Sequence, residues 1–119
     1  MDVPTPSARP IAFYHAEHLA HLRSWLSERE HVSEGRMFGV PAWFVSGRVF
    51  ACVWGPGVAL RLPAPQAQSV VASDGFEAFR PFGRAPMSGW LLRPLGSAQD
   101  VALSEALVSA SYAYVYGLG

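Results

Sequence analysis

Residues 36–54 read RMFGVPAWFVSGRVFACVW. The Ser46-Gly47 pair lies between two apolar runs, a pattern typical of a tight hairpin turn. We therefore expect strands over residues 37–45 and 48–54, the first interrupted by Gly39 and Pro41. The second is apolar on both faces, with Val49, Ala51 and Val53 on one and Phe50, Cys52 and Trp54 on the other. Such a strand is predicted to be central, with its second face covered by a helix or by another subunit.

The flanking sequence predicts the remaining elements. Leucines recur with helical spacing over residues 11–30 (Leu19, Leu22, Leu26) and again from residue 97 to 117 (Leu103, Leu107, then Ala110 and Tyr114). A third strand is expected over 58–62 after a Gly-Pro-Gly turn, a short helix over 66–73, and two further strands over 76–84 and 87–93. The order helix, three strands, helix, two strands, helix indicates an α+β fold with a five-stranded, largely antiparallel sheet. Residues 1–10 are expected to form a flexible tail and 11–119 a single domain.

Charge and composition limit the function classes. The chain has zero formal net charge and a pI near 6.9, although residues 36–93 carry six arginines against Asp74 and Glu77. A neutral chain lacks the basic surplus of a non-specific DNA-binding protein. One cysteine excludes an internal disulfide framework. No secretory signal or membrane-spanning run is visible, so we expect a cytoplasmic protein without membrane contact.

Few residues are candidates for chemistry. His15 and His18 are spaced to share a metal ion, but no further ligand is identifiable, and a structural role is the better interpretation. Cys52 has apolar neighbours, which indicates a buried thiol rather than a nucleophile. Common catalytic and phosphate-binding motifs are absent from the sequence. We therefore predict a protein that is not an enzyme and holds no cofactor.

Arginines and tryptophans provide the candidate binding residues. Arginines occur on or beside the expected strands, and they would form an Arg–aromatic surface if several shared a sheet face with a tryptophan. The candidates for contact with a partner or an anion are Arg48, Arg61, Arg80, Arg84, Trp43 and Trp90. The alternative is that each arginine lies along its own strand. Stacking on single-stranded nucleic acid is a further option, weakened by the neutral charge.

Several motifs, taken in order, resemble the TfoX/Sxy N-terminal domain family. They are Met37-Phe38-Gly39, Gly47-Arg48-Val49-Phe50-Ala51 and Pro81-Phe82-Gly83-Arg84, followed by Met87 and Trp90. The resemblance covers roughly residues 30–118 and implies the same order of helices and strands. Longer members are competence regulators with a second, C-terminal domain, so this chain is expected to correspond to the N-terminal domain alone.

The functional prediction is a non-enzymatic regulatory or adapter domain that acts through protein–protein contacts, as a homodimer with an unidentified protein partner. The first alternative is a nucleic-acid or anion-binding module that uses an arginine-bearing sheet face. The second alternative is a metal- or small-ligand-binding protein.

Overall fold

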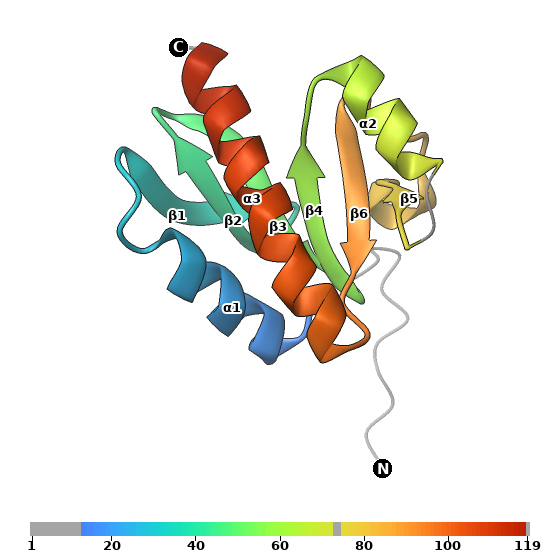
Figure 1. Ribbon diagram of the computed structural model, residues 1–119, viewed down its shortest axis with the longest axis horizontal. Helices are drawn as coiled ribbons and strands as arrows, with labels where there is room; N and C mark the ends of the chain where they lie inside the picture. Colours follow the sequence, from blue (N-terminus) through green and yellow to red (C-terminus); the bar gives the residue numbers. More distant parts are fainter. Residues whose placement is uncertain (1–12, 73–74, 119) are drawn as a thin grey trace.

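A six-stranded antiparallel sheet is the centre of the fold (Figure 1). The computed structural model describes residues 13–72 and 75–118. In chain order its elements are α1 (Ala16–Leu26), β1 (Val32–Met37), β2 (Val40–Val45), β3 (Arg48–Trp54), β4 (Gly57–Arg61), α2 (Ala64–Val71), β5 (Glu77–Ala78), the 3-10 helix η1 (Pro81–Gly83), β6 (Trp90–Pro94) and α3 (Ala98–Leu118). The strands are arranged in the order β1-β2-β3-β4-β6-β5. The α+β class is confirmed, whereas the prediction of five strands is wrong.

The additional strand is β1, which forms a hairpin with β2. Gly35 lies inside β1 and faces Ala42 of β2. Phe38 and Gly39 make the turn, and both have positive φ (56° and 82°). Positive φ at both central residues is the requirement of a type I′ hairpin turn. Residues 37–45 are therefore the end of one strand, a turn and a second strand.

Tight turns also connect the next three strands. Ser46 and Gly47 repeat the turn geometry, with φ of 51° and 82°, and they confirm the predicted hairpin between β2 and β3. Gly55 has a φ of 49° and, with Pro56, joins β3 to β4. Strands joined by such short turns pair with the strand that precedes or follows them in the sequence. Strands β1 to β4 thus form one continuous meander.

The other end of the sheet is less regular than predicted. The expected strand over 76–84 is only two residues long, because the chain turns into η1 at Pro81. Proline has no N–H to donate to a sheet ladder, so pairing stops there. Strand β6 pairs with both β4 and β5. A Cβ at Gly57 would overlap the carbonyl oxygen of Arg93, so glycine is needed where β4 meets β6.

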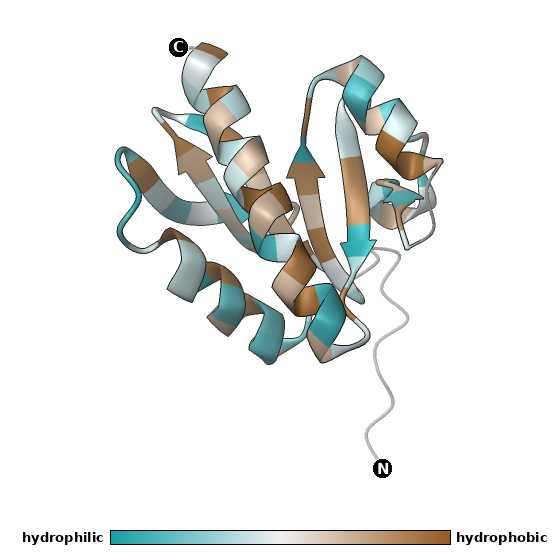
Figure 2. Cartoon of the chain, viewed as in Figure 1, coloured by the Kyte–Doolittle hydropathy of each residue, from teal (hydrophilic) through white to brown (hydrophobic). Residues whose placement is uncertain are grey.

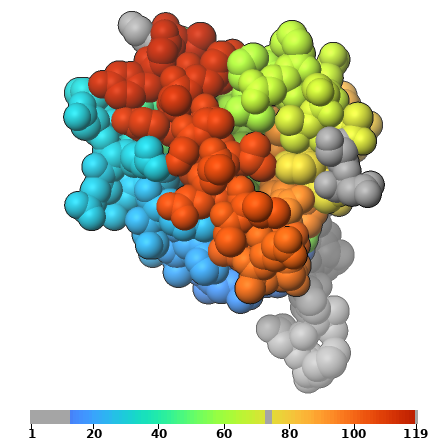
Figure 3. All heavy atoms as spheres, in the orientation of Figure 1, coloured from blue at the N-terminus to red at the C-terminus, as the bar shows by residue number. Residues whose placement is uncertain are grey.

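All three α-helices pack on one face of the sheet, and α3 crosses it between the other two (Figures 1 and 3). Helix α1 is shorter than predicted, since Tyr14 forms a bridge with Gly55 and His15 is extended; residues 11 and 12 lie outside the described part. Helix α3 begins at Ala98, one residue after the predicted start, and Ser97 caps it by accepting a hydrogen bond at Oγ from the Asp100 N–H (3.1 Å).

The buried stripes of the long helices differ from those expected. Helix α1 buries His18, Leu22 and Leu26, with Leu19 at the side. Helix α3 buries Ser104, Val108, Ser111 and Val115, while the predicted Leu103 is 57% exposed. Helix α3 is apolar over much of its length (Figure 2), and Leu103, Tyr116 and Leu118 are exposed, so periodicity alone does not identify the buried side.

A β-bulge in β3 changes which side chains share a face. Trp43 is paired with Ala51 but Phe44 with Val49, so Phe50 is the additional residue. Because a bulge interrupts the alternation of side chains, Phe50 joins Ala51 and Val53 in the core beneath the helices. Val49 joins Cys52 and Trp54 on the opposite face. Two-sided burial of β3 is confirmed, but the expected grouping of Val49 and Phe50 is wrong.

No helix in residues 13–72 and 75–118 has the length and apolarity required to cross a bilayer. The predicted tail over residues 1–10 lies outside the described part, so the predicted domain division stays a prediction.

Candidate functional site

The sheet face opposite the helices is the strongest candidate for a binding surface. Its buried centre contains Val40, Ala42, Cys52, Ala59 and Leu92. Phe79, Met87 and Tyr14 pack against this layer from the segments around β5, η1 and the start of α1. Tyr14 and Met87 are only partly buried, and six further apolar side chains on this side are also partly exposed. We call these six the open face: Met37, Phe38, Phe44, Val49, Trp54 and Phe82.

Aromatic rings form the most closely packed part of this side. The centroid of Trp54 lies 5.1 Å from that of Phe82 and 5.4 Å from that of Phe79, and both contacts are edge-to-face. Phe38 lies within 6.0 to 6.4 Å of the same three rings. Trp90 extends the group through Phe79, at 5.8 Å. Edge-to-face contacts of this kind stabilise by about 0.5–1.5 kcal/mol each beyond burial.

Two of these aromatics have a costly backbone conformation. Phe38 and Phe82 have φ of 56° and 57°, a region that bulky residues rarely adopt. The left-handed conformation costs an ordinary residue roughly 1–2 kcal/mol. Phe38 is nevertheless 42% exposed, so burial recovers only part of that cost. Strain retained at exposed side chains is a feature of functional surfaces.

The four candidate arginines do not gather on one face. Arg80 and Arg84 are exposed and flank η1, beside Phe82 of the open face. Arg48 is exposed at the start of β3, opposite Val45, whose side chain belongs to the helix-side core. Arg61 has its guanidinium 6.0 Å from the ring of Tyr114 in α3.

The two candidate tryptophans are buried on opposite sides of the sheet. Trp43 is 2% exposed in the core beneath the helices, whereas Trp90 is 6% exposed in the aromatic group. Neither ring is presented to solvent for stacking. The structure therefore does not assemble the six candidates into a single Arg–aromatic surface.

His15 and His18 lie together, with ring centroids 5.1 Å apart. His15 is exposed, whereas His18 is only 5% exposed. Burial, and secondarily the charge of His15, lowers the pKa of His18, which favours a neutral ring. Within residues 13–72 and 75–118, no three histidine, cysteine, aspartate or glutamate side chains are grouped to hold a metal ion.

Cys52 is completely buried in the central strand. Burial raises the pKa of its thiol to about 12. A nucleophilic cysteine requires a stabilised thiolate in an accessible position. The environment of Cys52 favours the neutral thiol, in agreement with the structural role inferred from its neighbours.

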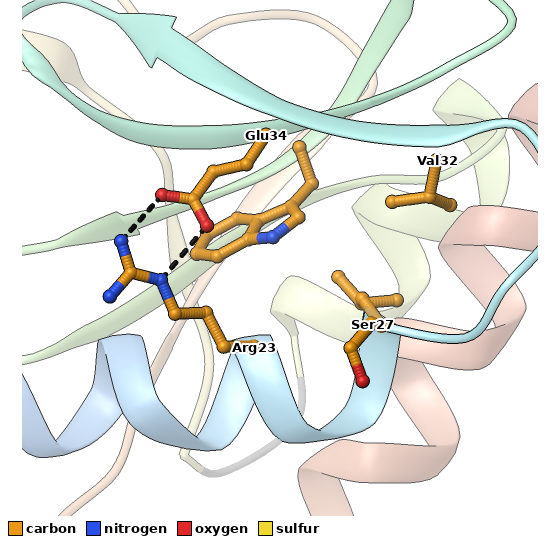
Figure 4. Close-up of a pocket in the computed structure, with 6 residues that line it drawn as sticks. Arg23, Ser27, Val32 and Glu34 are labelled. Carbon is orange, nitrogen blue, oxygen red and sulfur yellow. Dashed lines mark hydrogen bonds and ion pairs between the residues drawn. The ribbon is translucent and has the colours of Figure 1, made fainter.

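A shallow hollow of about 340 Å³ lies between α1 and β1 (Figure 4). Arg23 crosses it and donates two hydrogen bonds to Glu34, of 2.9 Å from Nε and 2.8 Å from Nη2. Leu26, Ser27, Val32 and Trp43 complete its lining. Because the charged groups satisfy each other, the hollow presents no free charge to a ligand.

Sequence reasoning did not identify Phe38 and Phe82 as site residues. For Phe38 a signal was present, because an X-Gly pair between apolar runs predicts a hairpin turn. A turn places residue 38 at an exposed tip rather than within a strand. For Phe82, the contact with Trp54 depends on the chain path after β5, which has no local pattern.

No family model, curated protein or solved structure matches the chain. The resemblance to the TfoX/Sxy N-terminal domain family therefore stays a prediction.

Proposed function

We propose that this chain is a non-enzymatic regulatory or adapter domain that acts in the cytoplasm through protein–protein contacts, as a homodimer. One observation carries the proposal. The sheet is apolar on both sides, and the side without α-helices keeps the six side chains of the open face partly exposed. Contiguous apolar side chains at a surface are characteristic of protein-binding sites, and aromatic residues are enriched in them.

The position of the family-like motifs supports the same proposal. Phe38 comes from the Met-Phe-Gly motif and Phe82 from the Pro-Phe-Gly-Arg motif, and their rings are 6.1 Å apart. Trp90 belongs to the same aromatic group. Two of the segments that resemble the TfoX/Sxy N-terminal domain thus meet on the open face, as expected for segments with a shared binding role.

A comparison of three forms of the protein in affinity capture tests the open face. A double variant, Phe38→Asn with Val49→Thr, removes apolar surface from the open face. Asparagine is favoured in a type I′ turn and threonine in a strand, so neither change conflicts with the local backbone. Leu103→Gln removes an exposed apolar residue from α3 and is the matched control. We expect the wild type and the control to capture the same protein and the double variant to lose it. Equal capture by all three would contradict the proposal, provided that each has a cooperative unfolding transition.

The alternative, a nucleic-acid or anion-binding module, is favoured only by Arg80 and Arg84 beside Phe82. Cationic and aromatic groups side by side can hold a phosphate backbone and a base. This function requires salt-dependent binding of single-stranded DNA or RNA that Arg80→Ala and Arg84→Ala weaken. Titrations without signal at low salt would eliminate it.

A further inference from the structure

Among residues 13–72 and 75–118, strand β1 forms one end of the sheet and pairs only with β2. Residues of an antiparallel pair alternate between those that exchange backbone hydrogen bonds and those whose N–H and C=O point away. Pro41, which faces Arg36, has no N–H and so belongs to the second kind. Arg36, and with it Glu34 two residues earlier, therefore directs its backbone N–H and C=O to the free edge.

The charges along this edge are complementary to those of the same edge in a second, antiparallel copy of the chain. Glu34 and Arg36 lie on either side of Gly35, and both side chains are exposed. Within the chain Glu34 also accepts two hydrogen bonds from Arg23, and Arg36 donates one to the Gly39 carbonyl (2.9 Å), so a contact with a partner would share the Glu34 carboxylate with Arg23. When a second copy of β1 is placed antiparallel with Gly35 facing the partner's Gly35, Glu34 faces the partner's Arg36. The same contact is repeated across the two-fold axis, because such an interface uses the same patch twice. Opposite charges that face each other across a strand pair stabilise it, and like charges destabilise it.

The charge pattern also selects the register. A shift that placed Glu34 opposite the partner's Glu34 would keep the backbone hydrogen bonds but bring like charges together. The register centred on Gly35 keeps the hydrogen bonds of both Glu34 and Arg36 and pairs their charges. An edge with charges of a single sign would repel a second copy, which is how many proteins protect their edges.

Gly35 suits the position on the two-fold axis. The ring of Phe44, an open-face residue, lies over Gly35, and a Cβ at Gly35 would be 3.0 Å from it. Two such rings, one from each copy, would approach each other across the axis on the open side. Pairing at the β1 edge would therefore join the two open faces into one apolar surface. Figure 1 shows β1 at one edge of the sheet, beside β2.

We propose that two copies of this chain associate by antiparallel pairing of β1 with β1, with Gly35 facing the partner's Gly35. The inference rests on the homodimer of the proposed function and assigns its contact to the sheet edge. The open face of each copy then remains free for a different protein. Complementary charge and unpaired backbone groups at one edge are the observations that carry it.

Charge reversal tests the register directly. Glu34→Arg places two cations opposite the partner's cations, and Arg36→Glu places anions opposite anions, so each variant alone should be monomeric by light scattering across a concentration series. An equimolar mixture restores opposite charges at every position. We expect the mixture to form a heterodimer containing one of each variant, identified by native mass spectrometry.

Two controls separate this effect from general damage. Arg23→Gln removes the ion pair between Arg23 and Glu34 without changing the edge charges, and should remain dimeric. Arg48→Glu reverses an exposed arginine away from β1, and should also remain dimeric. A dimeric wild type whose reversal variants remain dimeric, or do not pair when mixed, would overturn the edge register but leave the homodimer in place. A monomeric wild type at every concentration would overturn both.

Discussion

Ser111 links helix α3 to the strands at the point where the β3 bulge disturbs the sheet. Its Oγ lies 2.9 Å from the carbonyl oxygen of Phe50 and 2.6 Å from that of Arg61, and accepts from the Arg61 N–H at 3.2 Å. Phe50 is the additional residue of the bulge, and Arg61 ends β4. One buried hydroxyl thus satisfies backbone groups that a regular ladder would have paired.

Replacing this hydroxyl leaves buried backbone groups without partners. We expect Ser111→Ala to lower the free energy of unfolding by about 2–3 kcal/mol, because an unsatisfied buried polar group costs about 1–3 kcal/mol. Ser104 provides the matched control, since it is equally buried on α3 but its hydroxyl donates only to the Asp100 carbonyl one turn earlier. Ser104→Ala should change stability by no more than about 0.5 kcal/mol. Equal losses in urea denaturation would show that the bulge needs no support from Ser111.

The burial of these two serines was not predictable from the sequence. A helical stripe is normally recognised by its large apolar residues, and α3 offers them on several sides. Helix α3 places small residues against β3 and β4 and leaves Leu103 in solvent. The choice depends on the bulge, whose free backbone groups need a hydroxyl, and a bulge leaves no periodic signal in the chain.

At the scale of elements, the type I′ turns on either side of β2 provide an internal comparison. Asparagine is favoured at the first central position of such a turn. The chain has Phe38 at that position in one turn and Ser46 in the other, with φ of 56° and 51°. The same substitution at both positions separates the backbone contribution from that of the Phe38 ring.

Ser46→Asn should raise the free energy of unfolding by about 0.5–1 kcal/mol, because only the turn changes. Phe38→Asn should lower it by about 1–2 kcal/mol, since the same gain is exceeded by the loss of contacts with Trp54, Phe79 and Phe82. Urea denaturation of both variants measures the difference. A gain of similar size at both positions would mean that the Phe38 ring does not stabilise the fold.

The elements differ in how well the sequence predicted them. Strand β3 and helix α3 have long apolar sequences, and the Ser46-Gly47 turn has a strong local signal, so all three were predicted. Strand β1 was missed because it is an edge strand with no fully buried residue and with Gly35 in its middle. Its structure comes from pairing with β2, which a hydrophobic pattern does not report. The shortness of β5 likewise follows from a turn at Pro81.

For the whole molecule, the essential asymmetry is between a sheet face covered by three helices and one covered mainly by the segment from Phe79 to Met87. Two-sided apolarity of β3 predicted that both faces would be covered. The pattern did not predict that one face would be covered much less completely than the other, because coverage depends on which elements the chain places on each side. The open face is the consequence of that inequality.

Cys52 reports whether the less protected side opens independently. Its thiol lies in the same buried cluster as Phe79 and Trp90 and is completely buried, so a thiol reagent reacts only after some opening. If the whole domain must unfold, the labelling rate follows the unfolding equilibrium. Ser111→Ala, on the helix side, should then accelerate labelling about thirtyfold if it lowers the free energy of unfolding by about 2 kcal/mol.

We expect this coupled behaviour, because β3 contributes to both cores and the packing of either side depends on the same strand. The measurement is the rate of iodoacetamide modification at fixed pH, for the wild type, Ser111→Ala and Phe82→Ala. The expectation of coupled opening would be contradicted if Phe82→Ala raised the modification rate and Ser111→Ala left it unchanged. That result would show that the segment from Phe79 to Met87 opens locally, and that the open face extends beneath it when it does.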